Sequence, residues 1–292
     1  MNTIQMKAYG KVNLGLDVLR RREDGYHEVR MIMQTVQLYD KITIEERHQE
    51  GIELETNLPF LPVNENNIAY RAARMLMEEF HIPGGLSIKI EKHIPVAAGM
   101  AGGSTDGAAV LYGVNQIYQL GLTKRQLMER GVRLGADVPY CIMRGTVLSE
   151  GIGEILTPVA AMPDCHILVA KPPISVSTKY VYEHLRLDLV ERRPDIDGMI
   201  AALKAGNLKG VADTMENVLE TVTIPEHPEI AAIKDVMRSE GALNAMMSGS
   251  GPTVFGIFDD AEKGLRARDI LRNGTLAKQV YLVKPFNTRI YR

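Results

Sequence analysis

The sequence predicts an α+β protein of two domains, and three observations lead to this class. The 292 residues, 45% of them apolar, are enough chain to bury two adjoining cores. Residues 3–57 read as a succession of strands, whereas residues 178–240 read as a succession of helices. Residues 243–284 then follow the order strand, turn, strand, helix, strand, which is typical of an α+β sandwich with an antiparallel sheet. We expect one domain over residues 1–160 and another over residues 161–292.

The chain opens with a strand over residues 3–19, whose central segment alternates apolar and polar residues with a period of two. Lys11 and Asn13 therefore share one face of this strand, with the bare backbone of Gly15 beside them. This face is compatible with a substrate-binding wall, and equally with a half-exposed strand whose lysine is solvated. Further strands are expected over residues 29–38, 41–46 and 51–56.

A turn is predicted over residues 23–27, because Asp24 and Gly25 form a common turn pair. Its tip presents Tyr26 and His27 side by side. A histidine in such a loop is often only solvent-exposed, but an aromatic ring next to an imidazole can also stack on a nucleotide base and read it. Both interpretations remain open from the turn alone.

The most informative stretch runs from Pro95 to Ala109, between a strand over residues 85–94 and a helix over residues 105–120. Its glycines can adopt positive φ and let an anion approach the backbone closely, which predicts an anion cradle. Ser104 and Thr105 are expected at the helix cap, where unpaired amides and the helix dipole favour a phosphate. The glycines concerned are Gly99, Gly102 and Gly103.

Several nucleotide-binding motifs are excluded by what the loop lacks. No lysine follows Gly103, so the loop is not of the Walker A type. Neither this loop nor the turn from Ser248 to Gly251 has the spacing of a dinucleotide fingerprint, and the motifs of protein kinases are missing. A glycine-rich connection without a ligand remains the alternative, so other stretches must decide.

An acidic residue, Asp137, enters an apolar run directly after a helix over residues 124–134 that Gly135 ends. Asp137 either caps a short turn before Pro139 or provides a carboxylate in a partly desolvated pocket. The residue preferences alone do not separate these two roles.

The remaining elements complete the two halves of the chain. An amphipathic helix over residues 67–80 precedes the loop, and a hairpin over residues 147–158 ends the first half. The second half is expected to contain a strand over 165–170, helices over 178–187, 197–205, 208–222 and 228–240, two strands within 243–258, a helix over 261–273 and a strand over 279–284.

Composition restricts the classes of partner. The formal net charge is −2, and Lys and Arg are spread along the chain, which argues against nucleic-acid binding. Cys141 and Cys165 lie in apolar segments without metal-ligand spacing and are expected to be reduced thiols of a cytoplasmic protein. We expect no secretory or transit peptide and no membrane span.

Taken together, three motifs resemble those of the GHMP kinase superfamily, named for galactokinase, homoserine kinase, mevalonate kinase and phosphomevalonate kinase. They are Lys11 to Leu14, Pro95 to Ala109 and Met247 to Val254, in the order that the superfamily has. The resemblance covers the whole chain. It implies a ribosomal-protein-S5-like N-terminal domain and a ferredoxin-like C-terminal domain, with ATP and substrate bound in a cleft between them.

Within this superfamily, Asp24 to His27, the Gly-Gly-Ser form of the loop and Gly135 to Val138 are similar to one branch. That branch uses ATP and Mg²⁺ to phosphorylate the C2 hydroxyl of a cytidyl diphosphate sugar alcohol in the non-mevalonate isoprenoid pathway. Two departures stand out: Met100 replaces the usual leucine, and Gly-Ser-Thr-Asp-Gly replaces the more frequent Gly-Ser-Ser-Asp-Ala. They leave open whether Ser104 or Thr105 contacts Mg²⁺, and no metal ligand is assigned.

The resemblance also implies roles for individual residues. Lys11 and Asp137 would form the catalytic pair, and Asn13 would contact the substrate. Tyr26 and His27 would read the cytosine ring, which Tyr182, or alternatively Tyr180, would cover from the other side. Ser248 and Gly249 are expected at the substrate as well. The ATP phosphates would be bound by Pro95, Val96, Ala97, Ala98, Gly99, Met100, Ala101, Gly102, Gly103, Ser104 and Thr105.

Two other functions are weighed against this one. Another small-molecule kinase of the superfamily, of the homoserine or mevalonate type, would keep the ATP loop and change the acceptor site, and Tyr26 and His27 argue against it. A non-catalytic nucleotide sensor would be expected to lose the lysine or the acid, yet Lys11 and Asp137 are both present.

Overall fold

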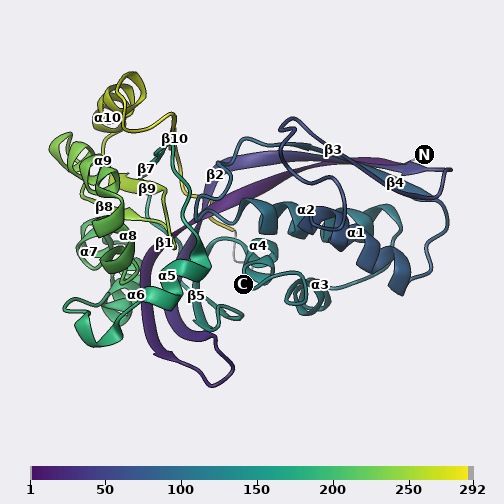
Figure 1. Cartoon of the computed structure of the whole chain (residues 1–292), viewed down its shortest axis with the longest axis horizontal. Helices are drawn as coiled ribbons and strands as arrows, with labels where there is room; N and C mark the ends of the chain where they lie inside the picture. The colour runs from purple at the N-terminus through teal and green to yellow at the C-terminus, as the bar shows by residue number, and fades with distance from the viewer. Residues whose placement is uncertain (1, 289–292) are drawn as a thin grey trace. The chain divides into compact units, whose positions relative to one another are not determined.

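The computed structural model describes residues 2–288, which form two compact units (Figure 1). Unit 1 comprises residues up to Gly10 together with Leu38–Val96 and Ala101–Met143. Unit 2 comprises Lys11–Gln37, Ala97–Met100 and the chain from Arg144 onward. Two long strands, β1 (Thr3–Arg21) and β2 (His27–Arg47), contribute residues to both units. The boundary near residue 160 stays a prediction. Each unit is assembled from several separate stretches of the chain, so the two units do not correspond to an N-terminal and a C-terminal part.

Unit 1 is a sheet covered by helices. In it, β4 (Gly85–Glu91) pairs antiparallel with the second half of β2, and β3 (Gly51–Thr56) pairs parallel with β4. Helices α1 (Ile68–Glu79) and α2 (Gly102–Ile117) pack against each other beside these strands (Figure 1). Two shorter helices, α3 (Lys124–Gly131) and α4 (Val138–Met143), complete the unit.

Local sequence explains where these helices begin and which face they bury. The side chain of Asn67 accepts a hydrogen bond from the amide of Ala69 and caps α1, whose buried residues recur at helical spacing. Thr123 and Gln126 form a reciprocal capping box at the start of α3. The buried face of α1 consists of Ala69, Ala72, Ala73 and Leu76.

Unit 2 contains the second half of β1, the first half of β2, a hairpin and a separate four-stranded sheet. The hairpin strands β5 (Thr146–Gly151) and β6 (Ile155–Pro158) pair antiparallel, and β5 pairs antiparallel with β2. The second sheet is antiparallel throughout and has the order β10-β7-β9-β8. Its strands are β7 (His166–Lys171), β8 (Asn244–Met247), β9 (Val254–Phe258) and β10 (Gln279–Val283).

Counted along the chain, this sheet has the order 4-1-3-2, with helices after its first and third strands, which is the ferredoxin-like arrangement. Helices α9 (Pro228–Ser239) and α10 (Ala261–Asn273) pack on the strands and on each other (Figure 1). The other helical segments are α5 (Thr178–His184), η1 (Leu187–Leu189), α6 (Ile196–Lys204), α7 (Leu208–Asp213) and α8 (Glu220–Glu226). The predicted α+β class is confirmed.

Three local predictions are wrong, and one helix was not predicted. Residues 29–38 and 41–46 are one continuous strand, because Asp40 is buried in an ion pair and does not turn the chain. The helix after the glycine-rich loop begins at Gly102, and its N-cap is Ala101 in the left-handed conformation, not Ser104 or Thr105. Residues 138–143 form α4, which was not predicted. The single helix expected over residues 208–222 is the two helices α7 and α8.

The break between α7 and α8 has a tertiary cause. The backbone of Leu16 in β1 donates to the carbonyl of Glu216 and accepts from the amide of Val218, so Asn217 forms a bridge to the strand. These residues therefore satisfy their backbone groups with a strand and not within a helix.

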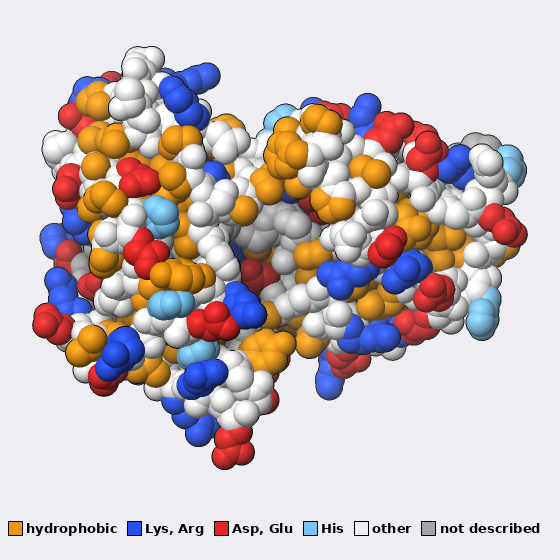
Figure 2. Space-filling model, viewed as in Figure 1, with side chains coloured by type: hydrophobic (Ala, Val, Ile, Leu, Met, Phe, Trp, Pro, Cys, Tyr) orange, Lys and Arg blue, Asp and Glu red, His pale blue; other side chains and the backbone are white. Residues whose placement is uncertain are grey.

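The surface carries charges of both signs. On the face drawn in Figure 2, Lys and Arg are interspersed with Asp and Glu among the described residues, and no extended basic field is visible there. Between residues 2 and 288, no helix is both long enough and apolar enough to cross a bilayer.

Candidate active site

The glycine-rich loop has an unusual backbone. Ala97, Gly99 and Ala101 all have positive φ, of 50°, 68° and 57°. Left-handed residues at alternate positions curl a chain so that amides face one concave side, as in anion-binding nests. Two of these residues are alanines, each of which costs roughly 1–2 kcal/mol in this conformation. The surrounding structure must therefore hold the loop in a shape that its own sequence does not favour.

The three glycines of the loop act in different ways. Only Gly99 has the positive φ that was predicted, since Gly102 and Gly103 are the first residues of α2. Gly102 is closely packed, because a Cβ there would lie 3.2 Å from Nζ of Lys92 and 3.3 Å from Cγ2 of Ile94, and these side chains would have to shift. The first amides of a helix have no acceptor within it, so the start of α2 offers donors and a positive dipole end to an anion.

Within unit 2, the first and third motifs meet at Gly99. The buried ammonium of Lys11 donates to Oδ1 of Asn13 (2.8 Å) and to the carbonyl of Gly99 (2.9 Å). The hydroxyl of Ser248 donates to the same carbonyl at 3.0 Å. Gly249 has φ of 58°, and a Cβ on it would lie 3.4 Å from the Gly99 oxygen. Residues from three distant segments thus fix one carbonyl and a positive charge beside it.

The aromatic residues expected at the cytosine ring also lie in unit 2. Tyr26 is 60% exposed at the turn tip, where its amide donates to Oδ1 of Asp24. The rings of His27 and Tyr182 have centroids 5.2 Å apart, at 42°. Tyr180 instead stacks on His184 and donates its hydroxyl to Glu226. Of the two tyrosines left open, Tyr182 is therefore the one beside His27.

Burial, together with the charge of Arg21, lowers the pKa of His27 from its usual value. The shift favours the neutral imidazole, which presents one donor and one acceptor.

Asp137 belongs to unit 1 and directly precedes α4. Its carbonyl accepts from the amide of Cys141 at 3.0 Å, and the residue is partly exposed. Lys11 belongs to unit 2, so the pairing of these two residues remains a prediction.

Comparisons with known proteins identify the family. The model of the GHMP kinases N terminal domain matches residues 67–145, and that of the GHMP kinases C terminal matches residues 199–275. The chain is 53% identical to the 4-diphosphocytidyl-2-C-methyl-D-erythritol kinase of Lachnoclostridium phytofermentans, over 99% of each chain. It is 54% identical to the kinase of that name from Lachnospira eligens, over 98% of this chain and 99% of the other.

The chain belongs to the 4-diphosphocytidyl-2-C-methyl-D-erythritol kinase family. A crystal structure of 4-(cytidine 5'-diphospho)-2C-methyl-D-erythritol kinase superposes with a TM-score of 0.84 at 31% identity, covering 98% of this chain and 100% of that one. Kinases of this family are GHMP kinases and take phosphate from ATP. The resemblance drawn from the three motifs, and the class of small-molecule kinase, are confirmed.

Two residues of this kinase that support the third motif were missed by sequence reasoning. The buried amide of Asn217 donates to the carbonyls of Met247 and Gly249, both at 2.8 Å. Glu220 accepts from the amide of Met247 at 2.7 Å and is paired with Lys234. Both were assigned to the interior of one helix, and the mixed polar and apolar sequence of residues 208–222 gives no signal of another role.

Over residues 2–288, no three side chains of His, Cys, Asp or Glu are grouped so that they could hold a metal ion. Mg²⁺ commonly binds through one or two protein groups together with substrate phosphates and water, and such a site needs no group of three.

Proposed function

We propose that the protein transfers the γ-phosphoryl group of ATP to the C2 hydroxyl of 4-diphosphocytidyl-2-C-methyl-D-erythritol, in the non-mevalonate route to isoprenoids. The observation that carries this proposal is that Lys11 and Ser248 both donate to the carbonyl of Gly99, in a chain of this kinase family. It brings the first motif and the third motif to the phosphate loop.

The loop from Pro95 to Thr105 is proposed to bind the phosphates of ATP through backbone amides. Its left-handed residues and the start of α2 support this role. Thr105 differs from the others, because its buried hydroxyl donates to the carbonyl of Tyr9 at 2.8 Å. Its side chain therefore supports the loop from below, which favours Ser104 as the hydroxyl at Mg²⁺. When bound, Mg²⁺ would neutralise charge on the phosphates.

Lys11 and Asp137 are proposed as the catalytic pair. Lys11 would steady the attacking oxygen and the incoming phosphoryl group with a charge that Asn13 and Gly99 already hold in place. Asp137 would accept the proton of the C2 hydroxyl. Phosphoryl transfer passes through a loose transition state, so positioning and charge neutralisation should dominate over early deprotonation.

Substrate selection is proposed to depend on Tyr26, His27 and Tyr182. The neutral imidazole would hydrogen-bond to the cytosine edge while the tyrosines cover its faces, a role that the contact between His27 and Tyr182 supports. Asn13, Ser248 and Gly249 would contact the rest of the substrate. We also infer a cytoplasmic location, which Cys141 and Cys165 support as buried cysteines that form no disulfide.

The test is an ADP-release assay with four acceptors: 4-diphosphocytidyl-2-C-methyl-D-erythritol, homoserine, mevalonate and galactose. We expect turnover with the cytidyl acceptor alone. Turnover with homoserine or mevalonate would identify another GHMP kinase activity. ATP binding without turnover on any acceptor would indicate a nucleotide sensor.

A further inference from the structure

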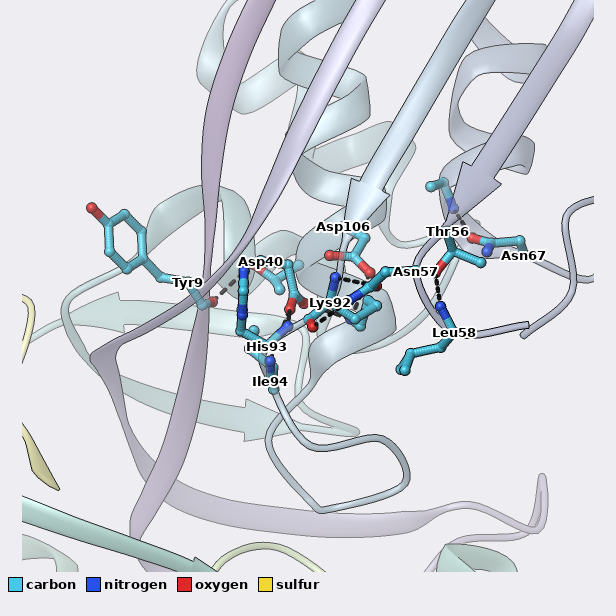
Figure 3. Close-up of polar contacts among 12 residues, drawn as sticks. Tyr9, Asp40, Thr56, Asn57, Leu58, Asn67, Lys92, His93, Ile94 and Asp106 are labelled. Atoms are coloured by element: carbon cyan, nitrogen blue, oxygen red, sulfur yellow. Dashed lines mark hydrogen bonds and ion pairs between the residues drawn. The ribbon is translucent and has the colours of Figure 1, made fainter. Parts of the chain in front are cut away.

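A buried ion cluster of unit 1 lies where the chain enters and leaves the glycine-rich loop, and the proposed mechanism does not use it (Figure 3). The ammonium of Lys92 contacts carboxylate oxygens of both Asp40 and Asp106, the latter at 2.7 Å. All three side chains are almost completely buried. Lys92 directly follows β4, Asp40 lies in β2, and Asp106 lies in the second turn of α2.

The cluster joins the two ends of the loop. On the strand side, Oδ1 of Asp40 accepts from the amides of His93 and Ile94, the latter at 2.8 Å (Figure 3). On the helix side, Asp106 carries the other carboxylate, and Gly102 packs directly over the ammonium of Lys92. The stretch that enters the loop and the helix that leaves it are thus tied to one cation.

Lys92 is itself held from several directions. Asn57, just after β3, accepts from the amide of Lys92 at 2.8 Å and donates to its carbonyl at 3.2 Å. The backbone of Lys92 is therefore fixed by one strand end while its side chain is fixed by two carboxylates. Such a side chain has little freedom, so it can hold its partners at a defined separation.

Burying these three charged side chains costs free energy of folding. Burial opposes the charge on Lys92, and the two carboxylates outweigh that effect and raise its pKa. Burial likewise opposes the charge on Asp106, and the nearby ammonium of Lys92 counters this effect. One oxygen of Asp106 has no hydrogen-bond partner among the described residues. Well-packed apolar side chains often stabilise a fold as much as a buried ion cluster does, so stability by itself does not account for these three residues.

We propose that Asp40, Lys92 and Asp106 are positioning residues that set the geometry of the phosphate loop for ATP. The inference rests on the proposed function, since the loop must be the ATP site. The cluster holds Ile94 and Gly102 at a defined separation, and the strained backbone between them keeps its shape because its ends cannot move apart. Loosening the cluster should therefore weaken ATP binding and leave the cytidyl substrate site intact.

The test compares Asp106→Asn with a control in the same helix. Asp106→Asn keeps the side-chain shape and one acceptor oxygen but removes the charge that faces Lys92. The control is Asn115→Ala, since buried Asn115 exchanges two hydrogen bonds of 3.0 Å with Leu122 at the far end of α2. Both variants should lower the melting temperature, but only Asp106→Asn should move the loop.

Calorimetric titration should give a dissociation constant for an ATP analogue that is at least about tenfold higher in Asp106→Asn, because small displacements at a site have large effects. The constant for the cytidyl substrate should be unchanged. Amide hydrogen exchange should become faster at residues 96–106 in this variant. In Asn115→Ala, exchange should become faster only near residues 115–122, and ATP affinity should be that of the wild type. Lys92→Met should show a larger effect than Asp106→Asn if it folds, and Asp106→Asn decides the question if it does not.

Two results would overturn the inference: a folded Asp106→Asn variant with wild-type ATP affinity, or equal losses for both ligands. A wild-type protein that binds no ATP would instead defeat the proposed function.

Discussion

Replacing Gly99 with alanine should damage the phosphate loop more than any comparable glycine substitution in unit 2. Gly99 has φ of +68°, where an alanine costs roughly 1–2 kcal/mol. In addition, a Cβ at this position would lie 2.1 Å from the carbonyl oxygen of Ser248. Real Cβ atoms essentially never come within 3.0 Å of another heavy atom in this way. Because the atom in the way belongs to the backbone of Ser248, the segments that contain Gly99 and Ser248 must move apart.

The required separation is roughly 1 Å, and a misplacement of that size can cost on the order of 10² in rate. It would act directly on the carbonyl to which Lys11 and Ser248 donate. We therefore expect Gly99→Ala to lower kcat/KM for ATP by about 10².

A matched control separates strain from displacement. Gly206 has φ of +66°, and no atom lies within 4 Å of a Cβ built there. Gly206→Ala thus carries the same backbone strain without the collision. Steady-state kinetics of both variants, with folding checked by circular dichroism, give the comparison. Equal kcat/KM values for Gly99→Ala and Gly206→Ala would refute the argument that Gly99 is needed for close approach.

Four further outcomes are expected. Tyr26→Ala should raise KM for the cytidyl substrate by the equivalent of roughly 1–3 kcal/mol, as removal of a ring that stacks on a base does; an unchanged KM would remove Tyr26 from the substrate site. His27 has a pKa below 6.5, so native protein binds fewer protons than unfolded protein and loses stability as pH falls from 6.5 through that pKa. KM for the cytidyl substrate should rise over the same range, and His27→Gln should abolish this pH dependence. Asn217→Ala removes the donor to two buried carbonyls, those of Met247 and Gly249. The free energy of unfolding in urea should fall by about 1–3 kcal/mol for each carbonyl. Asn217→Asp should be no more stable, because a carboxylate oxygen would face these carbonyls. Asp137→Asn should lower kcat by at least about 10² with ATP binding retained, and near-normal turnover would reduce Asp137 to a residue that precedes a helix.

Elements with a strong local pattern could be predicted from the sequence. The amphipathic spacing of α1 and α10, and the glycines of the hairpin between β5 and β6, indicate those elements with little error at their ends. Where the sequence prediction failed, a distant contact decides the structure. Asp40 continues a strand because Lys92 neutralises it, and Asn217 interrupts a helix because β1 and the third motif take up its backbone and side chain.

The candidate site could be predicted in its members but not in its contacts. The motifs containing Lys11, Gly99 and Ser248 are readable from residue types, yet no spacing in the chain indicates that they share one carbonyl. The left-handed alanines of the loop are unreadable too, since alanine disfavours that conformation and only the packed structure maintains it. The choice of Tyr182 over Tyr180 needed the position of a turn more than 150 residues away.

The most direct test of the central claim is identification of the phosphorylated product by ³¹P NMR. Purified protein is incubated with ATP, Mg²⁺ and 4-diphosphocytidyl-2-C-methyl-D-erythritol, and the spectrum is followed with time. We expect one new phosphomonoester resonance that grows in step with ADP while the diphosphate bridge to cytidine stays intact. It should show no coupling to hydrogen across the ester oxygen, because the methyl-bearing C2 carries no hydrogen. ADP formation without this resonance, or a phosphomonoester on another hydroxyl, would contradict the account.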